Sequence, residues 1–369
     1  PSDYKVLIFS HDAPLEELDY WASDIRNGEA LMNVLETYHN MQGHCVLGYI
    51  HGHTHADCVY LGRSFPIISI GCSKCEYFPD KKPEKSIRYE RKPDTVTQDL
   101  WDVLIEKPEQ KKLEFVRFGA GEDRCVSAGT KVWAHRGASG YAPENTLEAF
   151  TLAASMGADG VELDVQLTKD GEMVVVHDEE IDRVSDGSGF VKDYTLAELK
   201  TLNFNKTHPE YQDVKIPTLR EVYEALKPTG MTINVELKTG IFWYKDLEKK
   251  VLELTKEMEM EDRVIYSSFN HYSIAKILEL DPKASTGILY ADVIYDVVNY
   301  AKKIGTGALH PATFHVQMAD FLQLYVESDL AVHVWTVNDK AEIERLMDAG
   351  VDAVITNYPD VAVSCRNAK

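Results

Sequence analysis

The pattern of apolar and polar positions divides the chain into two regions. In the first region, short apolar runs predict three buried strands, at residues 6–9, 46–50 and 66–70. A helical pattern over about residues 29–40 separates the first two strands, which is typical of an α/β fragment. Gly-rich segments at 118–121 and 127–129 then precede a new strand. We therefore expect one domain over residues 1–127 and a second over residues 128–369.

The second region alternates regularly between strands and helices. Its short β-branched runs predict eight strands, near residues 132, 161, 233, 264, 286, 308, 332 and 353. Amphipathic patterns such as residues 146–156 and 340–349 predict helices between them. Apolar runs of this kind suit strands that are buried on both faces. Eight βα units in a segment of this size predict a closed (β/α)₈ barrel of the TIM type, within an α/β chain.

One element departs from this alternation. The apolar run at residues 173–177 follows the strand at 160–167 after only a Lys169-Asp170-Gly171 turn. A connection that short cannot cross over to a parallel strand, so the run should fold back as an antiparallel hairpin. We expect residues near 164 to lie beside residues near 177.

Composition narrows the classes of function. The formal charge of -21 and the lack of a dense Lys/Arg block disfavour nucleic acid as a partner. No apolar run reaches about 18 residues, so we expect no membrane span. Six cysteines in 369 residues form no dense disulfide framework, which favours a cytoplasmic location. The sequence does not indicate an oligomeric state.

Three carboxylates lie inside the apolar strands of the second region. Glu162 and Asp164 are two residues apart on one strand and therefore point to the same face, and Glu236 lies on another strand of the predicted barrel. Charges within apolar strands need a compensating partner. At the carboxyl ends of barrel strands, the three oxygen donors could hold one hard divalent cation, Mg²⁺ or Ca²⁺ rather than zinc.

Two histidines should stand at the same mouth. His135 ends the first barrel strand and His177 ends the hairpin strand. Cleavage of a phosphodiester requires removal of one proton from the attacking oxygen and donation of another to the leaving alkoxide, and two histidines can do both. Arg136 could stabilise the phosphoryl oxygens.

The second region resembles the glycerophosphodiester phosphodiesterase family. The resemblance rests on an ordered series of motifs: His135-Arg136-Gly137, Pro143-Glu144-Asn145-Thr146, Glu162-Leu163-Asp164-Val165, Val176-His177-Asp178, Ile216-Pro217-Thr218-Leu219, Glu236-Leu237-Lys238 and Val334-Trp335-Thr336-Val337-Asn338. It implies the distorted TIM barrel of phosphatidylinositol-specific phospholipases C and the release of sn-glycerol 3-phosphate and an alcohol from a glycerophosphodiester.

The resemblance also implies a role for each matching residue. His135 and His177 match the acid-base pair, Glu162, Asp164 and Glu236 the cation ligands, and Arg136 and Lys238 the phosphate-contacting cations. Glu144 and Asn145 match a turn that supports the ligands, and Trp335 matches an aromatic residue at the mouth. Asn357 stands where relatives more often carry Asp, and we expect no effect on catalysis because it is not a ligand position.

The first region carries three further histidines after predicted strands, His11, His53 and His55. His-x-His after a strand is a metal-ligand pattern. The region resembles the C-terminal half of a calcineurin-like metallophosphoesterase and lacks the upstream motifs of that family. It is either a residual half-domain or part of a complete enzyme whose first half precedes Pro1, and the missing initiator Met favours the latter. Additional transition metals are expected only in the second case.

Two other functions compete with glycerophosphodiester hydrolysis. A lysophospholipase D acting on lipid substrates would need an apolar groove at the barrel mouth, and the absence of an amphipathic basic anchor in the sequence weighs against it. A non-catalytic phosphodiester-binding barrel would not need the two histidines that this sequence carries.

Overall fold

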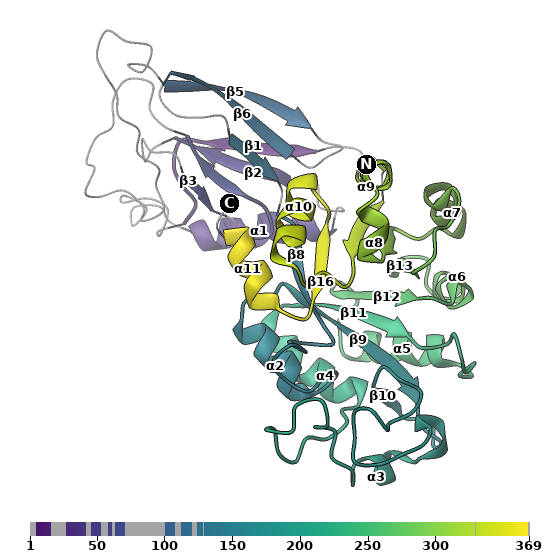
Figure 1. The fold of residues 1–369 in the computed structure, drawn as a ribbon. Helices are drawn as coiled ribbons and strands as arrows, with labels where there is room; N and C mark the ends of the chain where they lie inside the picture. Colours follow the sequence, from purple (N-terminus) through teal and green to yellow (C-terminus); the bar gives the residue numbers. More distant parts are fainter. Residues whose placement is uncertain are drawn as a thin grey trace. The chain divides into compact units, whose positions relative to one another are not determined.

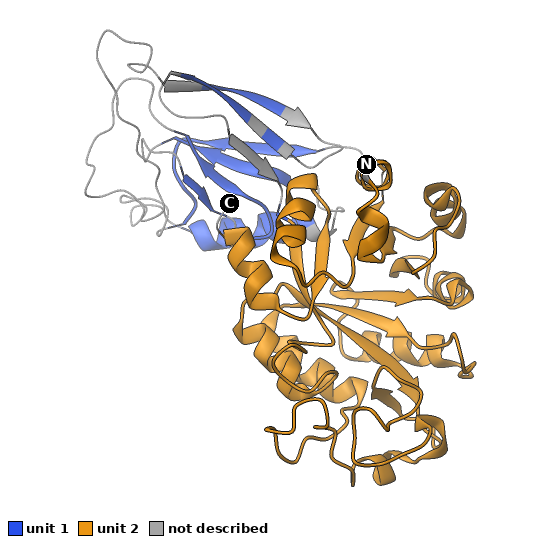
Figure 2. Cartoon of the chain, viewed as in Figure 1, with its two compact units in different colours: residues 1–129 blue, residues 130–369 orange. Residues whose placement is uncertain are grey.

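The structure is a computed structural model, and it describes residues 5–15, 27–41, 46–52, 58–60, 63–70, 100–107, 112–119, 124–127, 129–328 and 330–367. The chain forms two compact units, residues 1–129 and residues 130–369, each coloured separately in Figure 2. Each unit has hydrophobic clusters of its own.

The first unit contains a mixed four-stranded sheet. Its order is β1 (Val6–Ser10), β2 (Val46–His51), β4 (Ile67–Ser69) and β3 (Cys58–Tyr60). Strands β1, β2 and β4 are parallel and correspond to the three predicted runs, whereas β3 pairs antiparallel to β4. Helix α1 (Gly28–Met41) lies between β1 and β2 in the sequence, as predicted.

A second sheet in this unit was not predicted. Strands β5 (Leu100–Lys107), β6 (Lys112–Gly119) and β7 (Arg124–Ser127) form an antiparallel meander. Leu113, Phe115 and Arg117 alternate along β6 with buried side chains, and Arg117 forms an ion pair with Asp102 on β5 at 2.6 Å. The expected Gly-rich spacer at 118–121 is therefore wrong at its start, where residues 118 and 119 complete β6.

The second unit is an eight-stranded parallel barrel, as predicted (Figure 1). Its strands are β8 (Lys131–His135), β9 (Gly160–Leu167), β11 (Thr232–Leu237), β12 (Val264–Ser268), β13 (Ser285–Tyr290), β14 (Ala308–Pro311), β15 (Ala331–Val334) and β16 (Ala353–Thr356). Pairing of β8 with both β16 and β9 closes the barrel. Closure brings residues from the two ends of this unit's sequence to one mouth.

Helices follow the strands and cover the outside of the barrel (Figure 1). They are α2 (Leu147–Ser155), α4 (Leu219–Leu226), α5 (Leu247–Glu257), α6 (His271–Leu280), α7 (Val297–Ile304), α8 (Thr313–Val316), α9 (Ala319–Val326), α10 (Lys340–Ala349) and α11 (Pro359–Asn367). Their apolar faces and the strands form two large clusters of buried side chains. No helix in the described part of the chain is long and apolar enough to cross a membrane.

The predicted hairpin is also present. Strand β10 (Met173–Val175) pairs antiparallel to β9, with Val175 opposite Val165. The backbone N–H of Val176 then donates to the carbonyl of Asp164 at 3.0 Å, which carries the following residue, His177, to the barrel mouth. Residues 178–216 follow with the short helix α3 (Leu196–Leu199) and a small apolar core of their own.

Candidate active site

The three predicted carboxylates meet on the neighbouring strands β9 and β11. Glu162 and Asp164 share one face of β9, and the parallel register places Glu236 beside Asp164. One oxygen from each side chain lies within 4.8 Å of the other two. All three side chains are buried, with 5%, 0% and 7% of their residues' surfaces exposed. This acidic triad is the only group of three or more candidate metal ligands that the described residues form.

A bound cation would balance the negative charges of the acidic triad. Burial and the charges of Asp164 and Glu236 raise the pKa of Glu162 well above its ordinary value when no cation lies between them. Burial would also raise the pKa of Asp164, but the charges of His177, Arg136 and Lys238 outweigh burial and hold that pKa below its ordinary value. Oδ1 of Asp164 is buried and accepts no hydrogen bond. Three converging oxygen donors with one unsatisfied atom fit a hard divalent cation.

His135 stands beside this acidic triad at the end of β8. Its Nε2 lies 4.0 Å from Oε2 of Glu162, and its Nδ1 lies 2.7 Å from Oδ1 of Asn357, just beyond β16. An amide oxygen only accepts, so Nδ1–H donates and Nε2 carries the lone pair. Burial, assisted by the charge of Arg136, lowers the pKa of His135 to about 4. The imidazole is thus held neutral, with its basic nitrogen toward the acidic triad.

His177 is held by a different kind of partner. Its Nδ1 lies 2.6 Å from Oδ1 of Asp178, and Nε of Arg183 donates to the other oxygen of Asp178 at 2.6 Å. The same guanidinium donates two hydrogen bonds of 2.7 Å to Glu144. A chain of charged groups therefore runs from Glu144 through Arg183 and Asp178 to His177. This chain fixes the ring and leaves Nε2 available for proton transfer.

Two cations flank the carboxylates. Nζ of Lys238 lies 3.0 Å from Glu236 and 3.8 Å from Asp164, and Nε of Arg136 lies 3.5 Å from Asp164. Burial opposes the charge of Lys238, but the two carboxylates prevail and raise its pKa. Both side chains are mostly buried and close enough to the acidic triad to contact a bound phosphate.

The predicted supporting turn lies directly behind the ligands. Nδ2 of Asn145 donates to Oδ2 of Asp164 at 2.8 Å, and Glu144 accepts a hydrogen bond from Arg136 at 2.9 Å. Arg136 and Asn145 both adopt a left-handed backbone, with φ of 55° and 58°. This conformation turns the backbone N–H of Arg136 toward Glu162, to which it donates at 3.0 Å.

Trp335 lies at the mouth but is anchored to the protein. Its Nε1 donates to the carbonyl of His310 at 2.8 Å, and its ring packs edge-to-face on Phe269 at 5.4 Å. Trp335 is partly buried, whereas Phe269 is exposed. The pair forms one aromatic wall beside the mouth.

Three residues that hold the two histidines in place were missed or dismissed in the sequence. Asp178 follows His177 directly, and an acid next to a candidate catalytic His was an available signal. Arg183 lies in the irregular segment that follows β10, and nothing in its local sequence indicates its partners. Asn357 was expected to be irrelevant because it is not a ligand, but it holds His135 across 222 positions of sequence.

The histidines of the first unit are only partly described. His11 lies just beyond β1, as predicted, and its carbonyl accepts a hydrogen bond from Gly52 at 3.3 Å. His53 and His55 lie outside the described residues. The remnant metal site that they were expected to form with His11 therefore stays a prediction.

Comparison with known proteins gives this geometry a context. Residues 135–361 match the glycerophosphoryl diester phosphodiesterase family. A glycerophosphodiester phosphodiesterase of Caldanaerobacter subterraneus subsp. tengcongensis is 41% identical over 236 residues, which cover 64% of this chain and 97% of that protein. One from Bacillus subtilis is 36% identical over 247 residues, 62% of this chain and 83% of the relative.

Solved structures agree. A phosphodiesterase of Oleispira antarctica, in complex with the product sn-glycerol 3-phosphate, superposes with a TM-score of 0.57 at 31% identity, covering 65% of this chain and 97% of that one. A glycerophosphodiester phosphodiesterase of Thermotoga maritima gives a TM-score of 0.53 at 30% identity, with 64% and 98% coverage. These matches give no support to a metallophosphoesterase-like half in residues 1–127. The barrel accounts for the likeness, and through it the chain belongs to the glycerophosphoryl diester phosphodiesterase family.

Proposed function

We propose that the barrel hydrolyses glycerophosphodiesters to sn-glycerol 3-phosphate and an alcohol, with His135 and His177 as the acid-base pair. This proposal rests on one arrangement. Two imidazoles, each held by a hydrogen bond, and the positively charged side chains of Arg136 and Lys238 surround one buried acidic triad. An acidic triad alone could bind a cation but would not supply the proton transfers that cleavage needs. The imidazoles add the two proton transfers that diester cleavage needs.

One divalent cation, Mg²⁺ or Ca²⁺, belongs to this proposal. Glu162, Asp164 and Glu236 would hold it through carboxylate oxygens, which both of these cations prefer. When bound, it supplies positive charge against the phosphoryl oxygens as negative charge develops on them. Arg136 and Lys238 contribute to the same stabilisation from the sides of the acidic triad.

The two histidines divide the proton transfers according to their partners. Nε2 of His135 takes a proton from the attacking oxygen as the new P–O bond forms. Attack by water gives sn-glycerol 3-phosphate directly, whereas attack by the substrate's own glycerol hydroxyl gives a cyclic phosphodiester, which water opens to sn-glycerol 3-phosphate in a second step. His177 gives a proton from Nε2 to the leaving alkoxide as the old P–O bond breaks. The carboxylate of Asp178 stabilises the positive charge that the acid carries before this step, whereas the neutral amide of Asn357 suits a base that starts uncharged.

Release of sn-glycerol 3-phosphate from glycerophosphocholine, coupled to glycerol-3-phosphate dehydrogenase, tests this function. We expect turnover by the full chain, loss on chelation and recovery when Mg²⁺ or Ca²⁺ is returned. A Glu236→Gln variant should bind the cation more weakly and need more of it for half-maximal rate. Turnover that persists at full rate after exhaustive chelation would contradict the cation's part in the proposal.

For residues 1–127 we propose the C-terminal half of a calcineurin-like metallophosphoesterase. Support comes from parallel strands β1 and β2 with His11 directly after β1. In the sequence, His53 and His55 follow β2 at His-x-His spacing. Metal analysis tests whether this half works in a complete enzyme, because additional transition metals are expected only with an upstream half. A transition metal that such a protein binds, and that a His53→Ala/His55→Ala variant loses, would support the proposal. No transition metal at all would leave a structural unit.

A further inference from the structure

The mouth of the barrel is unusually apolar over three neighbouring strands. The connections after β11, β12 and β13, together with the first turn of α6, expose six large apolar side chains, which we call the apolar rim: Ile241, Trp243, Phe269, Tyr272, Val293 and Tyr295. Strand β12 pairs with both β11 and β13, so the three connections are adjacent. They follow neighbouring strands on the face that carries the acidic triad.

These side chains are exposed to solvent, several of them almost completely. Tyr295 is 95% exposed, Tyr272 81% and Trp243 65%. Single exposed apolar residues are ordinary, but a contiguous set marks an interaction surface. At the other end of the strands, the described residues of the αβ connections at 156–159, 258–263, 281–284 and 305–307 include no exposed large apolar side chain. The asymmetry links the apolar rim to the catalytic face.

The apolar rim is continuous with the active site through one contact. Phe269 packs edge-to-face on Trp335 at the mouth. The apolar rim therefore borders the opening of the barrel at which the acidic triad lies. A surface of this kind suits a substrate that is itself held in an apolar phase.

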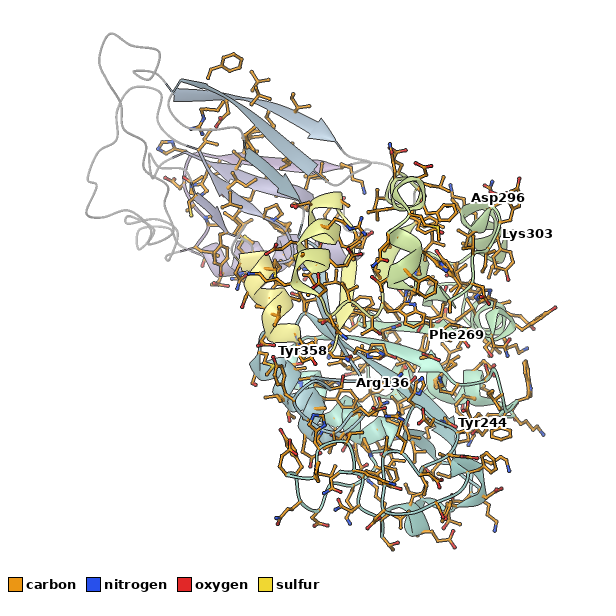
Figure 3. The ribbon with its side chains drawn as sticks, viewed as in Figure 1. Arg136, Tyr244, Phe269, Asp296, Lys303 and Tyr358 are labelled. Carbon is orange, nitrogen blue, oxygen red and sulfur yellow. The ribbon has the colours of Figure 1, made fainter. Side chains whose placement is uncertain are left out.

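The charges around the apolar rim favour one kind of lipid surface over another. Among its connections, Asp246, Asp292 and Asp296 are exposed, against one exposed cation, Lys245, so negative charge is in excess. Asp296 lies at the start of α7 in Figure 3. The whole chain carries a formal charge of -21. An anionic lipid surface would repel it, whereas the outermost groups of a phosphatidylcholine surface are quaternary ammonium ions. Such ions complement carboxylates and bind the faces of Tyr and Trp rings.

We propose that the apolar rim docks the barrel mouth onto a zwitterionic, choline-bearing lipid interface. Trp and Tyr rings settle at the headgroup level of a bilayer or micelle, and the aliphatic side chains enter just below it. Docking brings glycerol-based phosphodiesters in that interface to the acidic triad. This consequence rests on the proposed function, whereas docking itself does not.

Sedimentation of the full chain with phosphatidylcholine vesicles tests the proposal, with phosphatidylglycerol vesicles as the anionic arm. The test variant is Trp243→Ser/Tyr272→Ser/Tyr295→Ser. The matched control, Leu280→Ser/Leu324→Ser, removes exposed apolar side chains from the end of α6 and from α9. We expect the wild type and the control to bind phosphatidylcholine equally, and the test variant to partition at least about tenfold more weakly. Binding to phosphatidylglycerol should be weaker for all three.

Hydrolysis of water-soluble glycerophosphocholine separates docking from the proposed function. The test variant should keep the wild-type rate on this substrate. Vesicle binding without any hydrolysis would leave docking in place and overturn the proposed function. Absence of wild-type binding, or equal binding by the test variant, would overturn docking. Self-association that the test variant abolishes, without vesicle binding, would also overturn it and assign the apolar rim to a second copy of the chain.

Discussion

Oδ1 of Asn357 lies 2.7 Å from Nδ1 of His135, although the two residues are separated by almost the whole barrel sequence. The contact exists because β16 pairs with β8 and closes the barrel. It fixes the tautomer of His135 that leaves Nε2 basic.

This contact predicts that different substitutions of Asn357 lower activity to different extents. Asn357→Ala removes the acceptor, so we expect kcat on glycerophosphocholine to fall by about 10- to 100-fold with little change in KM. Asn357→Asp keeps an acceptor oxygen and should retain most of the activity. Asn299→Ala, an exposed asparagine on α7, is the control and should behave as wild type. Equal activity of the Ala variant and wild type would show that Asn357 does not position His135.

The chain of charges behind His177 predicts an order of effects. Asp178 contacts the imidazole directly, whereas Arg183 acts on it only through Asp178. We therefore expect Asp178→Ala to lower kcat by about 10²-fold or more, and Arg183→Met to lower it less. Steady-state kinetics on glycerophosphocholine would check the order. A larger loss for Arg183→Met would mean that the guanidinium contacts the substrate itself.

The buried imidazole of His310 should make the fold less stable at acidic pH. It lies on β14 inside the barrel, bonded to His333 of β15 at 2.8 Å and packed near Trp133 of β8. Burial lowers the pKa of His310 from 6.5 to about 3. The unfolded chain therefore takes up a proton between these values that the folded chain refuses, so stability is lost as pH falls below about 6.5.

The loss attributable to His310 should approach about 1.4 kcal/mol per pH unit within this window. Urea unfolding at pH 7.5, 6 and 5 measures it. A His310→Asn variant should lose less stability than wild type over the same range, whatever its stability at pH 7.5. Parallel pH profiles for the two proteins would show that His310 does not titrate on unfolding in this range.

Packing around the same imidazole predicts a costly glycine substitution. A Cβ placed at Gly287 on β13 would lie 2.2 Å from Nε2 of His310. We expect Gly287→Ala to destabilise the barrel by about 1–3 kcal/mol through overpacking. At Gly307 an added Cβ meets nothing within 4 Å, so Gly307→Ala serves as the control in thermal unfolding. A Gly287→Ala protein that melts with the control would mean that the ring moves aside freely.

The barrel and its carboxylates could be predicted from sequence because their signals are local. Buried parallel strands read as apolar runs, and a spacing of two puts Glu162 and Asp164 on one face. The hairpin at β10 followed from the length of a single turn. Each of these inferences needed only neighbouring residues and a known barrel geometry.

The residues that orient the histidines could not be predicted in the same way. The pairing of Asn357 with His135 depends on barrel closure, and that of Arg183 with Glu144 on the path of an irregular segment. The antiparallel meander β5–β7 did carry a local signal, the alternation of Leu113, Phe115 and Arg117, but no strand was predicted there, and only residues 118–121 were interpreted, as a Gly-rich spacer. The exposure of the apolar rim could not be predicted from the sequence, because an apolar residue in a loop can be either buried or exposed.

The central claim is that His135 and His177 perform the two proton transfers beside a cation-binding acidic triad. The most direct test measures sn-glycerol 3-phosphate release from glycerophosphocholine by the His135→Ala and His177→Ala proteins. Each variant must first be shown to have the melting temperature of the wild type and to bind Mg²⁺ or Ca²⁺ as the wild type does. We predict that each variant loses about 10²- to 10⁴-fold in kcat while cation binding persists. Near wild-type turnover by either variant would contradict the account.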